Sequence, residues 1–352
     1  MQITNNESRM QWVDAMRGFS MLIVVLGHVL LQMGIGGYDS FLSSVLLTFR
    51  MPLFFFVSGF FSYRAIKWWN RHKLLDILKR KFQAQILCTV IFCIIFQYAM
   101  TNGGSISFEH GFGGYWFTIV LFQMYIIYLL LSLISKGISR DIVIPSLIII
   151  SIAFIGILVI YDRSSQIWEF LCWENLTKYM QFFSAGIICS KYRDRFFKLL
   201  ENNTFITITI IGWIICMILW YNGGFQNKFS ILYSFVHDII VRYFALFSVV
   251  ICFFSKRNFF ADASAYSKCL KFIGRRTLDI YMIHYFLLPN LSYLKDYLNT
   301  GNTLIIQILI GGGLTVAIVA VCLLISAILR KSATLEAWLF GVKPKPQTKP
   351  IL

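Results

Sequence analysis

Charged residues are scarce in this sequence. Only 14% of its 352 residues are Asp, Glu, Lys or Arg, whereas 58% are hydrophobic. An ordinary soluble domain carries about 25% charged residues. No long stretch is free of an apolar run, so the sequence offers no separate soluble domain. Because a soluble fold could not bury this much apolar surface, we predict an all-α, polytopic membrane protein that sits in the lipid bilayer.

Motifs typical of metalloproteins and soluble enzymes are also missing. The eight cysteines are scattered, with no Cys-x-x-Cys pair and no His/Cys spacing of a metal ligand set. There is no P-loop, no GxGxxG fingerprint, no GxSxG elbow and no glycosidase-type carboxylate pair. We therefore expect no disulfide framework, no metal and no tightly bound cofactor. The first apolar segment is too long for a cleavable signal peptide, so we expect it to stay in the membrane.

Ten apolar segments are long enough to be predicted as membrane-spanning helices. They cover residues 15–33, 41–62, 82–100, 115–135, 142–161, 175–191, 204–221, 234–254, 270–288 and 303–329. We assign residues 1–335 to a single transmembrane domain and residues 336–352 to a short cytoplasmic tail. Gly311, Gly312 and Gly313 in the last segment allow close helix packing or a local break.

The distribution of basic residues predicts the orientation. Of the 32 Lys and Arg residues, 25 lie in alternate connections and at the ends of the chain, and only four lie in the opposite loops. Under the positive-inside rule, both termini are then cytoplasmic and the protein crosses its membrane several times. The net charge of +16 is therefore mainly a topology signal, and we expect no nucleic-acid partner. Binding of anionic lipid by residues 64–81 is a secondary hypothesis.

Two ionisable residues, Arg17 and His28, lie in the first apolar segment, 11 residues apart. On an α-helix this spacing is roughly 16 Å of rise and nearly the same face. Asp14 lies one turn before Arg17 and can pair with it. Ionisable residues at bilayer depth cost about 2.5–3.5 kcal/mol, so they are functional candidates by default. The alternative is that Arg17 extends to the interface and His28 is a hydrogen-bonded core residue.

Arg50 lies about halfway along the second segment. Its side chain cannot easily reach either membrane surface from there, so it must face a polar cavity or a partner. A purely structural arginine is the alternative. Pro52 favours a kink nearby, and Ser58-Gly59 allows another helix to approach closely.

Six further residues are candidates for a substrate pocket: Asp238, Arg242, Tyr281, His284, Glu109 and Trp116. Asp238 and Arg242 are four residues apart and form either a structural ion pair or part of a site. Tyr281 and His284 share a helix face with Thr277, but a hydrogen-bonded core histidine is an equal alternative. Glu109 belongs to the external loop 101–114. Trp116 is most simply part of an aromatic belt at the interface.

Four motifs occur in order along the chain: Asp14-x2-Arg17-x10-His28, then Phe49-Arg50-Met51-Pro52-Leu53-Phe54-Phe55-Phe56-Val57-Ser58-Gly59-Phe60, then Tyr115-Trp116-Phe117, then Ile273-Gly274-x3-Leu278-x-Ile280-Tyr281-x2-His284. This combination resembles the bacterial integral-membrane acyltransferase-3 family, close to its fucose 4-O-acetylase-related branch. The resemblance covers essentially the whole chain.

This resemblance implies an O-acyltransferase of a bacterial inner membrane. Such an enzyme transfers acyl groups other than aminoacyl groups. The group, usually acetyl, moves from cytoplasmic acetyl-CoA or another acyl-CoA to a hydroxyl of a cell-envelope polysaccharide or its lipid-linked precursor. By the same resemblance, His28 is the catalytic histidine, and Arg17 and Arg50, with Asp14 beside Arg17, line the acyl-donor site. Many members have a small residue or a histidine where Arg50 stands. No fused SGNH-type esterase domain follows the tenth segment, so we expect direct transfer to the acceptor.

The physical chemistry is compatible with this expectation. The pantetheine arm of CoA is comparable in length to the roughly 16 Å between Arg17 and His28. A histidine of near-neutral pKa is suited to act as general base on a hydroxyl. The main alternative is a transporter or flippase for a glycan or polyanionic substrate, because buried arginines and histidines also mark transport routes. Transporters usually contain internal repeats, which are not evident here.

Overall fold

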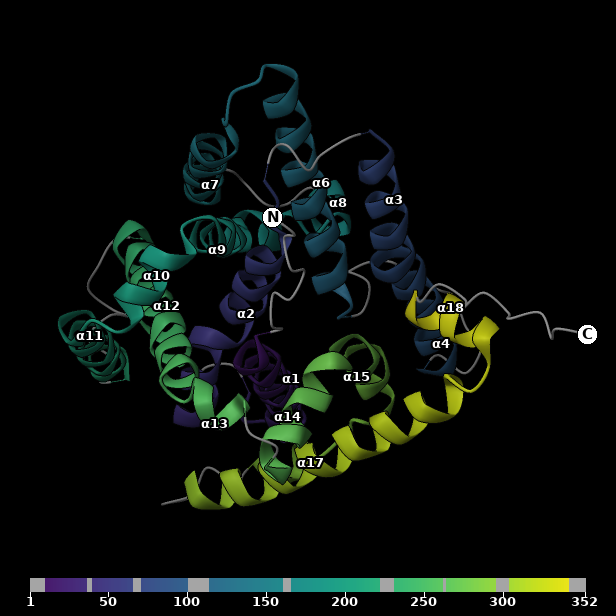
Figure 1. Ribbon diagram of the computed structural model, residues 1–352. Helices are drawn as coiled ribbons and strands as arrows, with labels where there is room; N and C mark the ends of the chain where they lie inside the picture. Colours follow the sequence, from purple (N-terminus) through teal and green to yellow (C-terminus); the bar gives the residue numbers. More distant parts are fainter. Residues whose placement is uncertain are drawn as a thin grey trace, which may run out of the picture. The chain divides into compact units, whose positions relative to one another are not determined.

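The computed structural model describes residues 10–36, 40–65, 71–100, 114–160, 166–221, 231–261, 264–295 and 304–341. Within these ranges the chain is helical and contains no β-strand. Among the described residues, six helices are long and apolar enough to cross a membrane, or seven if one bent pair counts as a span. The prediction of an all-α, polytopic membrane fold is thus confirmed. The chain divides into two compact units, and Figure 1 follows their helices along the sequence.

The first unit consists of residues Met1–Phe54, Asp194–Thr277 and Asn290–Thr315. Its helices are α1 (Gln11–Gln32), the first part of α2 (Phe41–Ser62), nearly all of α10 (Arg193–Leu200), α11 (Asn203–Tyr221), α12 (Ile231–Ser255), α13 (Arg257–Ala261), α14 (Ala265–Arg275), the short 3₁₀ turn η4 (Ser292–Leu294) and the first part of α17 (Leu304–Leu329).

In the first unit, α1 and α14 pack with their backbones in contact (Figure 1). A Cβ on Gly18 would overlap with the carbonyl oxygen of Leu270, and a Cβ on Gly274 would overlap with the carbonyl oxygen of Asp14. Small residues at such crossings let two helices approach closely. This crossing fixes α1, which carries the candidate residues, against α14.

The second unit consists of residues Phe55–Arg193, Leu278–Pro289 and Val316–Leu352. It contains the last part of α2, α3 (Arg71–Lys81), the π-helix η2 (Phe82–Leu87), α4 (Cys88–Met100), α6 (Trp116–Gly137), α7 (Val143–Ile160), α8 (Gln166–Phe170), α9 (Trp173–Lys191), nearly all of α15 (Thr277–Ile283), the 3₁₀ turn η3 (His284–Leu287), the last part of α17 and α18 (Ala333–Phe340).

A second glycine crossing joins α2 to α9. A Cβ on Gly59 would overlap with the carbonyl oxygen of Phe183, and a Cβ on Gly186 would overlap with that of Phe56. The close approach predicted for Ser58-Gly59 is confirmed. Helix α2 runs from Phe41 to Ser62 with Pro52 inside it, so the proline does not end the helix.

The helix α18 packs on the long helix formed by α3, η2 and α4. Gln83 Nε2 donates a hydrogen bond to the carbonyl oxygen of Ala337, at 3.0 Å. Gly341 follows α18 with φ of +64°, a left-handed conformation that favours glycine, and packs against Ala84. The predicted boundary between domain and tail, at residues 335 and 336, therefore falls inside a packed helix.

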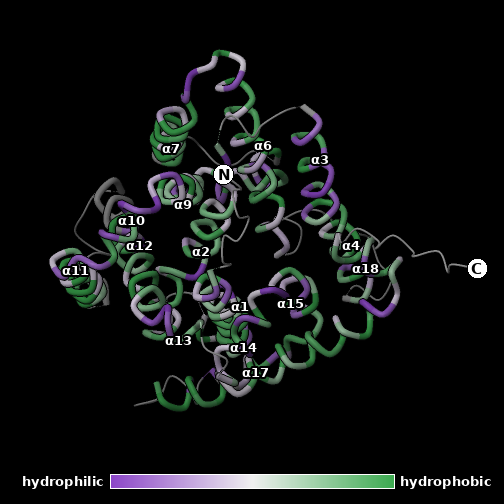
Figure 2. Tube along the Cα trace, viewed as in Figure 1, coloured by the Kyte–Doolittle hydropathy of each residue, from purple (hydrophilic) through white to green (hydrophobic). Residues whose placement is uncertain are grey.

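Figure 2 shows α7 and α17 as mostly hydrophobic and α3 as mostly hydrophilic. Helix α17 is continuous from Leu304 to Leu329, so the three glycines cause no break. Gly311 lies close to Leu26 and Leu30, and the other two glycines have no neighbour within 4 Å of an added Cβ. The sequence analysis allowed close helix packing or a local break at these glycines. The structure shows close packing, at Gly311 alone among the three.

The predicted span at residues 270–288 was wrong as a single helix. The structure divides it into α14, which ends at Arg275, then α15 and the 3₁₀ turn η3. The first of these is amphipathic: Leu270, Ile273 and Gly274 are buried, whereas the basic residues near its end are not. Averaging hydropathy along the sequence hides this separation of faces.

Candidate functional site

Arg17 lies in the first unit at the junction between α14 and α15. Its Nη2 donates a hydrogen bond to Thr277 Oγ1 at 3.3 Å. Thr277 is the first residue of α15 and is buried. The crossing at Gly18 holds the neighbouring turn of α1 against α14, so the position of Arg17 is set by backbone packing as well as by this hydrogen bond.

Arg50 reaches from α2 to α1, where its guanidinium lies against the backbone of Gly27. A Cβ on Gly27 would overlap with Arg50 Nη1. Gly27 directly precedes His28 in α1. The structure therefore brings Arg50 to the helix segment that carries His28, and both residues are half-buried. A role for Arg50 at a polar site stays a prediction.

Gly27 is a residue that the sequence analysis missed. A glycine inside a helix costs about 1 kcal/mol relative to alanine, so its presence usually has a packing reason. Its position directly before His28 could have drawn attention to it. The partner, Arg50, could not have been identified from this signal, because helix spacing along one segment says nothing about contacts with another.

Asp14 is buried in the first turn of α1, with 5% of its surface exposed. Its backbone carbonyl is the atom that Gly274 approaches at the helix crossing. This role is structural. A pairing of its side chain with that of Arg17 stays a prediction.

Asp238 and Arg242 form the ion pair predicted from their spacing. Arg242 Nε lies 2.8 Å from Asp238 Oδ2, and only 5% of the Arg242 side chain is exposed. The charges thus lie together on one face of α12, as expected for residues four apart.

Tyr281 and His284 lie in the second unit, within a cluster of tyrosines. Tyr281 and Tyr285 both donate hydrogen bonds to the carbonyl oxygen of Gly114, at 3.1 and 2.9 Å. Tyr115 donates to the carbonyl oxygen of Met282 at 2.9 Å. These contacts join the start of α6 to α15 and η3.

His284 is fully buried and starts the 3₁₀ turn η3. Its Nδ1 lies 2.9 Å from the carbonyl oxygen of Tyr281 and 3.0 Å from that of Ile280. Since carbonyl oxygens only accept, Nδ1 carries the proton. This geometry matches the hydrogen-bonded core histidine that was the alternative to a pocket role.

Trp116 begins α6 and stacks on Tyr179 of α9, with ring centroids 5.8 Å apart and an interplanar angle of 15°. Phe55 lies against both rings. Trp116 is therefore part of an aromatic cluster between helices. Glu109, the remaining candidate, lies outside the described residues.

The described part of the chain contains no group of three His, Cys, Asp or Glu residues that could hold a metal ion. Its eight cysteines are free thiols. Among the candidates in the first unit, the two arginines Arg17 and Arg50 can bind anionic or carbonyl oxygens, and the imidazole of His28 can accept a proton.

A protein-family model described as an acyltransferase domain, Acyl_transf_3, matches residues 10–327. The matched region includes every candidate residue named above. No curated protein and no solved structure matches the chain.

Proposed function

The chain belongs to the acyltransferase family whose model spans residues 10–327, and we propose that this membrane acyltransferase moves an acyl group, usually acetyl, from acyl-CoA to a hydroxyl of a cell-surface glycan or its lipid-linked precursor. The observation that carries the proposal is the contact of Arg50 with Gly27, directly before His28. It gathers a cation and a base on one part of α1.

In the proposed reaction, the His28 imidazole takes the proton of the acceptor hydroxyl while its oxygen attacks the thioester carbonyl. The carbonyl oxygen gains negative charge in the tetrahedral intermediate. A guanidinium beside the site stabilises that charge, which is the role we assign to Arg50. The C–S bond then breaks, and the imidazolium returns its proton to the CoA thiolate. Atoms and charge balance without a metal or a second cofactor.

Arg17 is assigned to donor binding. It lies three turns before His28 on nearly the same face of α1, roughly 16 Å along the axis. Its hydrogen bond to Thr277 directs the guanidinium towards the junction of α14 and α15. An arginine at this distance can bind the donor's polar groups while the thioester reaches His28.

The proposal is tested by mass spectrometry of the cell-surface glycan from cells with the gene, without it, and complemented with variants. We expect one acyl ester to disappear on deletion and to return with the wild-type gene but not with His28→Ala. A general base typically contributes about 10²–10⁴ in rate. The matched control is His72→Ala, which removes an exposed histidine from α3. A glycan unchanged by deletion, or full acylation by His28→Ala, would rule out the proposal.

A further inference from the structure

A basic pocket lies in the second unit, between the end of α2, α3 with η2, and α6. Its volume is about 460 Å³, which is within the usual range for small-ligand sites. Eleven residues line it: Phe61, Ser62, Arg64, Ile77, Arg80, Lys81, Ala84, Tyr125, Tyr128, Leu129 and Gly341. Three of these side chains are cationic and two are phenolic, whereas none of the described lining residues is acidic.

The three cations are held in place by uncharged groups. Arg64 Nη1 donates hydrogen bonds to the carbonyl oxygens of Phe61 and Tyr63, at 3.2 and 2.7 Å. Lys81 Nζ lies 3.7 Å from the ring centroid of Tyr125. Arg80 Nε donates to the carbonyl oxygen of Asp76 at 3.2 Å. These contacts position the cations around the pocket.

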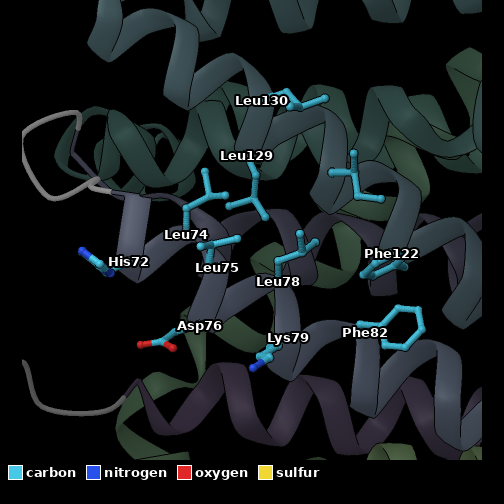
Figure 3. Close-up of a pocket in the computed structure, with 11 residues that line it drawn as sticks. His72, Leu74, Leu75, Asp76, Leu78, Lys79, Phe82, Phe122, Leu129 and Leu130 are labelled. Carbon is cyan, nitrogen blue, oxygen red and sulfur yellow. The ribbon is translucent and has the colours of Figure 1, made fainter.

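A different groove lies on the opposite side of the same helix. It has a volume of about 700 Å³ and is lined mainly by leucines and phenylalanines of α3, η2 and α6. Figure 3 shows Leu74, Leu75 and Leu78 gathered near Leu129, with Asp76 and Lys79 at the edge. The charges there are of both signs. This groove therefore differs from the basic pocket, whose described lining residues include three cations and no acidic residue.

We propose that the basic pocket binds a phosphate group. Arginine forms paired hydrogen bonds with phosphate oxygens, and lysine adds a point charge. The pocket adjoins the highly charged helix α3, at the end of an apolar one, where a phosphate at a membrane surface would be found. Two ligands present such a group: the nucleotide part of the acyl donor, which rests on the proposed function, and the headgroup of an anionic phospholipid.

The test uses the full-length purified protein and two probes. Adenosine 3′,5′-bisphosphate, titrated by calorimetry against protein in phosphatidylcholine nanodiscs, represents the nucleotide. Phosphatidylglycerol, counted by native mass spectrometry after detergent extraction, represents the lipid. The double variant Arg80→Gln/Lys81→Gln should weaken binding of one probe by about tenfold or more. Binding should also weaken as salt is raised, because the pocket is open to solvent.

The matched control is Lys73→Gln/Lys79→Gln. It removes the same charge from the same helix, but neither residue lines the basic pocket. It should keep the wild-type affinity within about twofold. If Lys81→Gln impairs folding, Arg80→Gln alone serves, because Arg80 is exposed.

The outcomes separate the two sources. Loss of bisphosphate binding identifies a nucleotide site, whereas loss of retained phosphatidylglycerol identifies a lipid site. If the wild-type protein binds neither probe, or if pocket and control variants behave alike, the proposal is wrong. Neither measurement uses acyl transfer, so a failure here leaves the glycan experiment with His28→Ala unaffected.

Discussion

The guanidinium of Arg50 occupies the space in which any other residue at position 27 would have its Cβ. The glycine before His28 therefore makes room for the Arg50 side chain of α2 and not for the backbone of another helix. At Gly18, on the same helix, an added Cβ would meet the backbone of Leu270 and not a side chain. A flexible side chain can move away from an added methyl group, whereas backbone in a packed helix cannot do so cheaply.

This difference leads to a paired prediction. Gly27→Ala should displace the Arg50 side chain and lower acyl transfer by about tenfold or more, with little change in thermal stability. Gly18→Ala should instead force α1 and α14 apart and lower the free energy of unfolding by about 1–3 kcal/mol. Both are measured by transfer activity and by the midpoint of thermal aggregation in detergent.

The control for the pair is Gly312→Ala in α17, since nothing lies within 4 Å of a Cβ added there. It should leave activity unchanged and should not lower stability, because alanine is favoured over glycine in a helix by about 1 kcal/mol. An inactive Gly27→Ala protein that is as unstable as Gly18→Ala would contradict the role given to this contact.

Two replacements of Arg50 distinguish the effect of its positive charge on transfer from the effect of its planar guanidinium. Arg50→Ala should abolish most transfer, because it removes the positive charge that lies against Gly27, directly before His28. Arg50→Lys should recover only part of the activity, since an ammonium lacks the planar set of donors. Initial rates of transfer to the acceptor at saturating donor are the measurement. If lysine supports the wild-type rate, charge alone is sufficient and the guanidinium has no specific role.

The general fold was predictable from sequence because apolar runs of about 20 residues have few fates other than membrane helices. The ends of α2 were predicted as observed, and those of α7 within one residue. The segment at 270–288 was not predicted as observed. The charges of α14 lie on one face of the helix, and a hydropathy average along the sequence combines them with the apolar face. The pairing of buried Asp279 with Arg330, which directly follows α17, also has no signature along the sequence.

The candidate site was predictable in part. Arg17 and His28 stand out because a single helix contains both, and their spacing gives a common face without any tertiary information. The contact of Arg50 with Gly27 needs the relative position of two helices. The same is true of His284, whose hydrogen bonds to the carbonyl oxygens of Ile280 and Tyr281 depend on the change from α15 to the 3₁₀ turn.

The predicted topology has a direct test. Single cysteines at His72 and Ser105 would be introduced into a cysteine-free background and exposed to an impermeant thiol reagent on intact cells. Because the connection that includes His72 is strongly basic, position 72 should be protected and position 105 labelled. Permeabilised cells provide the control, with both positions labelled. The reverse pattern in intact cells would refute cytoplasmic termini.

The second unit contains a buried ion pair that joins α15 to Arg330, the residue directly after α17. Arg330 donates two hydrogen bonds to Asp279, both at 2.8 Å, and Ser326 donates a third. Only 2% of the Asp279 side chain and 14% of the Arg330 side chain are exposed. Arg330 also contacts Glu336 of α18 at 2.6 Å. This network therefore holds three helical elements together.

Asp279→Ala should lower the free energy of unfolding by about 3–5 kcal/mol, because it leaves a partly buried guanidinium without its main counterion. Glu201→Ala is the matched control, because it breaks an exposed ion pair with Arg257. The Glu201 side chain is 55% exposed and the Arg257 side chain 42%. An exposed pair is worth about 0–1 kcal/mol, since water and salt screen its charges. Thermal aggregation midpoints in one detergent measure both variants. Equal shifts would mean that the Asp279 pair is screened like a surface pair, and that α15 is held chiefly by the tyrosine contacts with Gly114 and Met282.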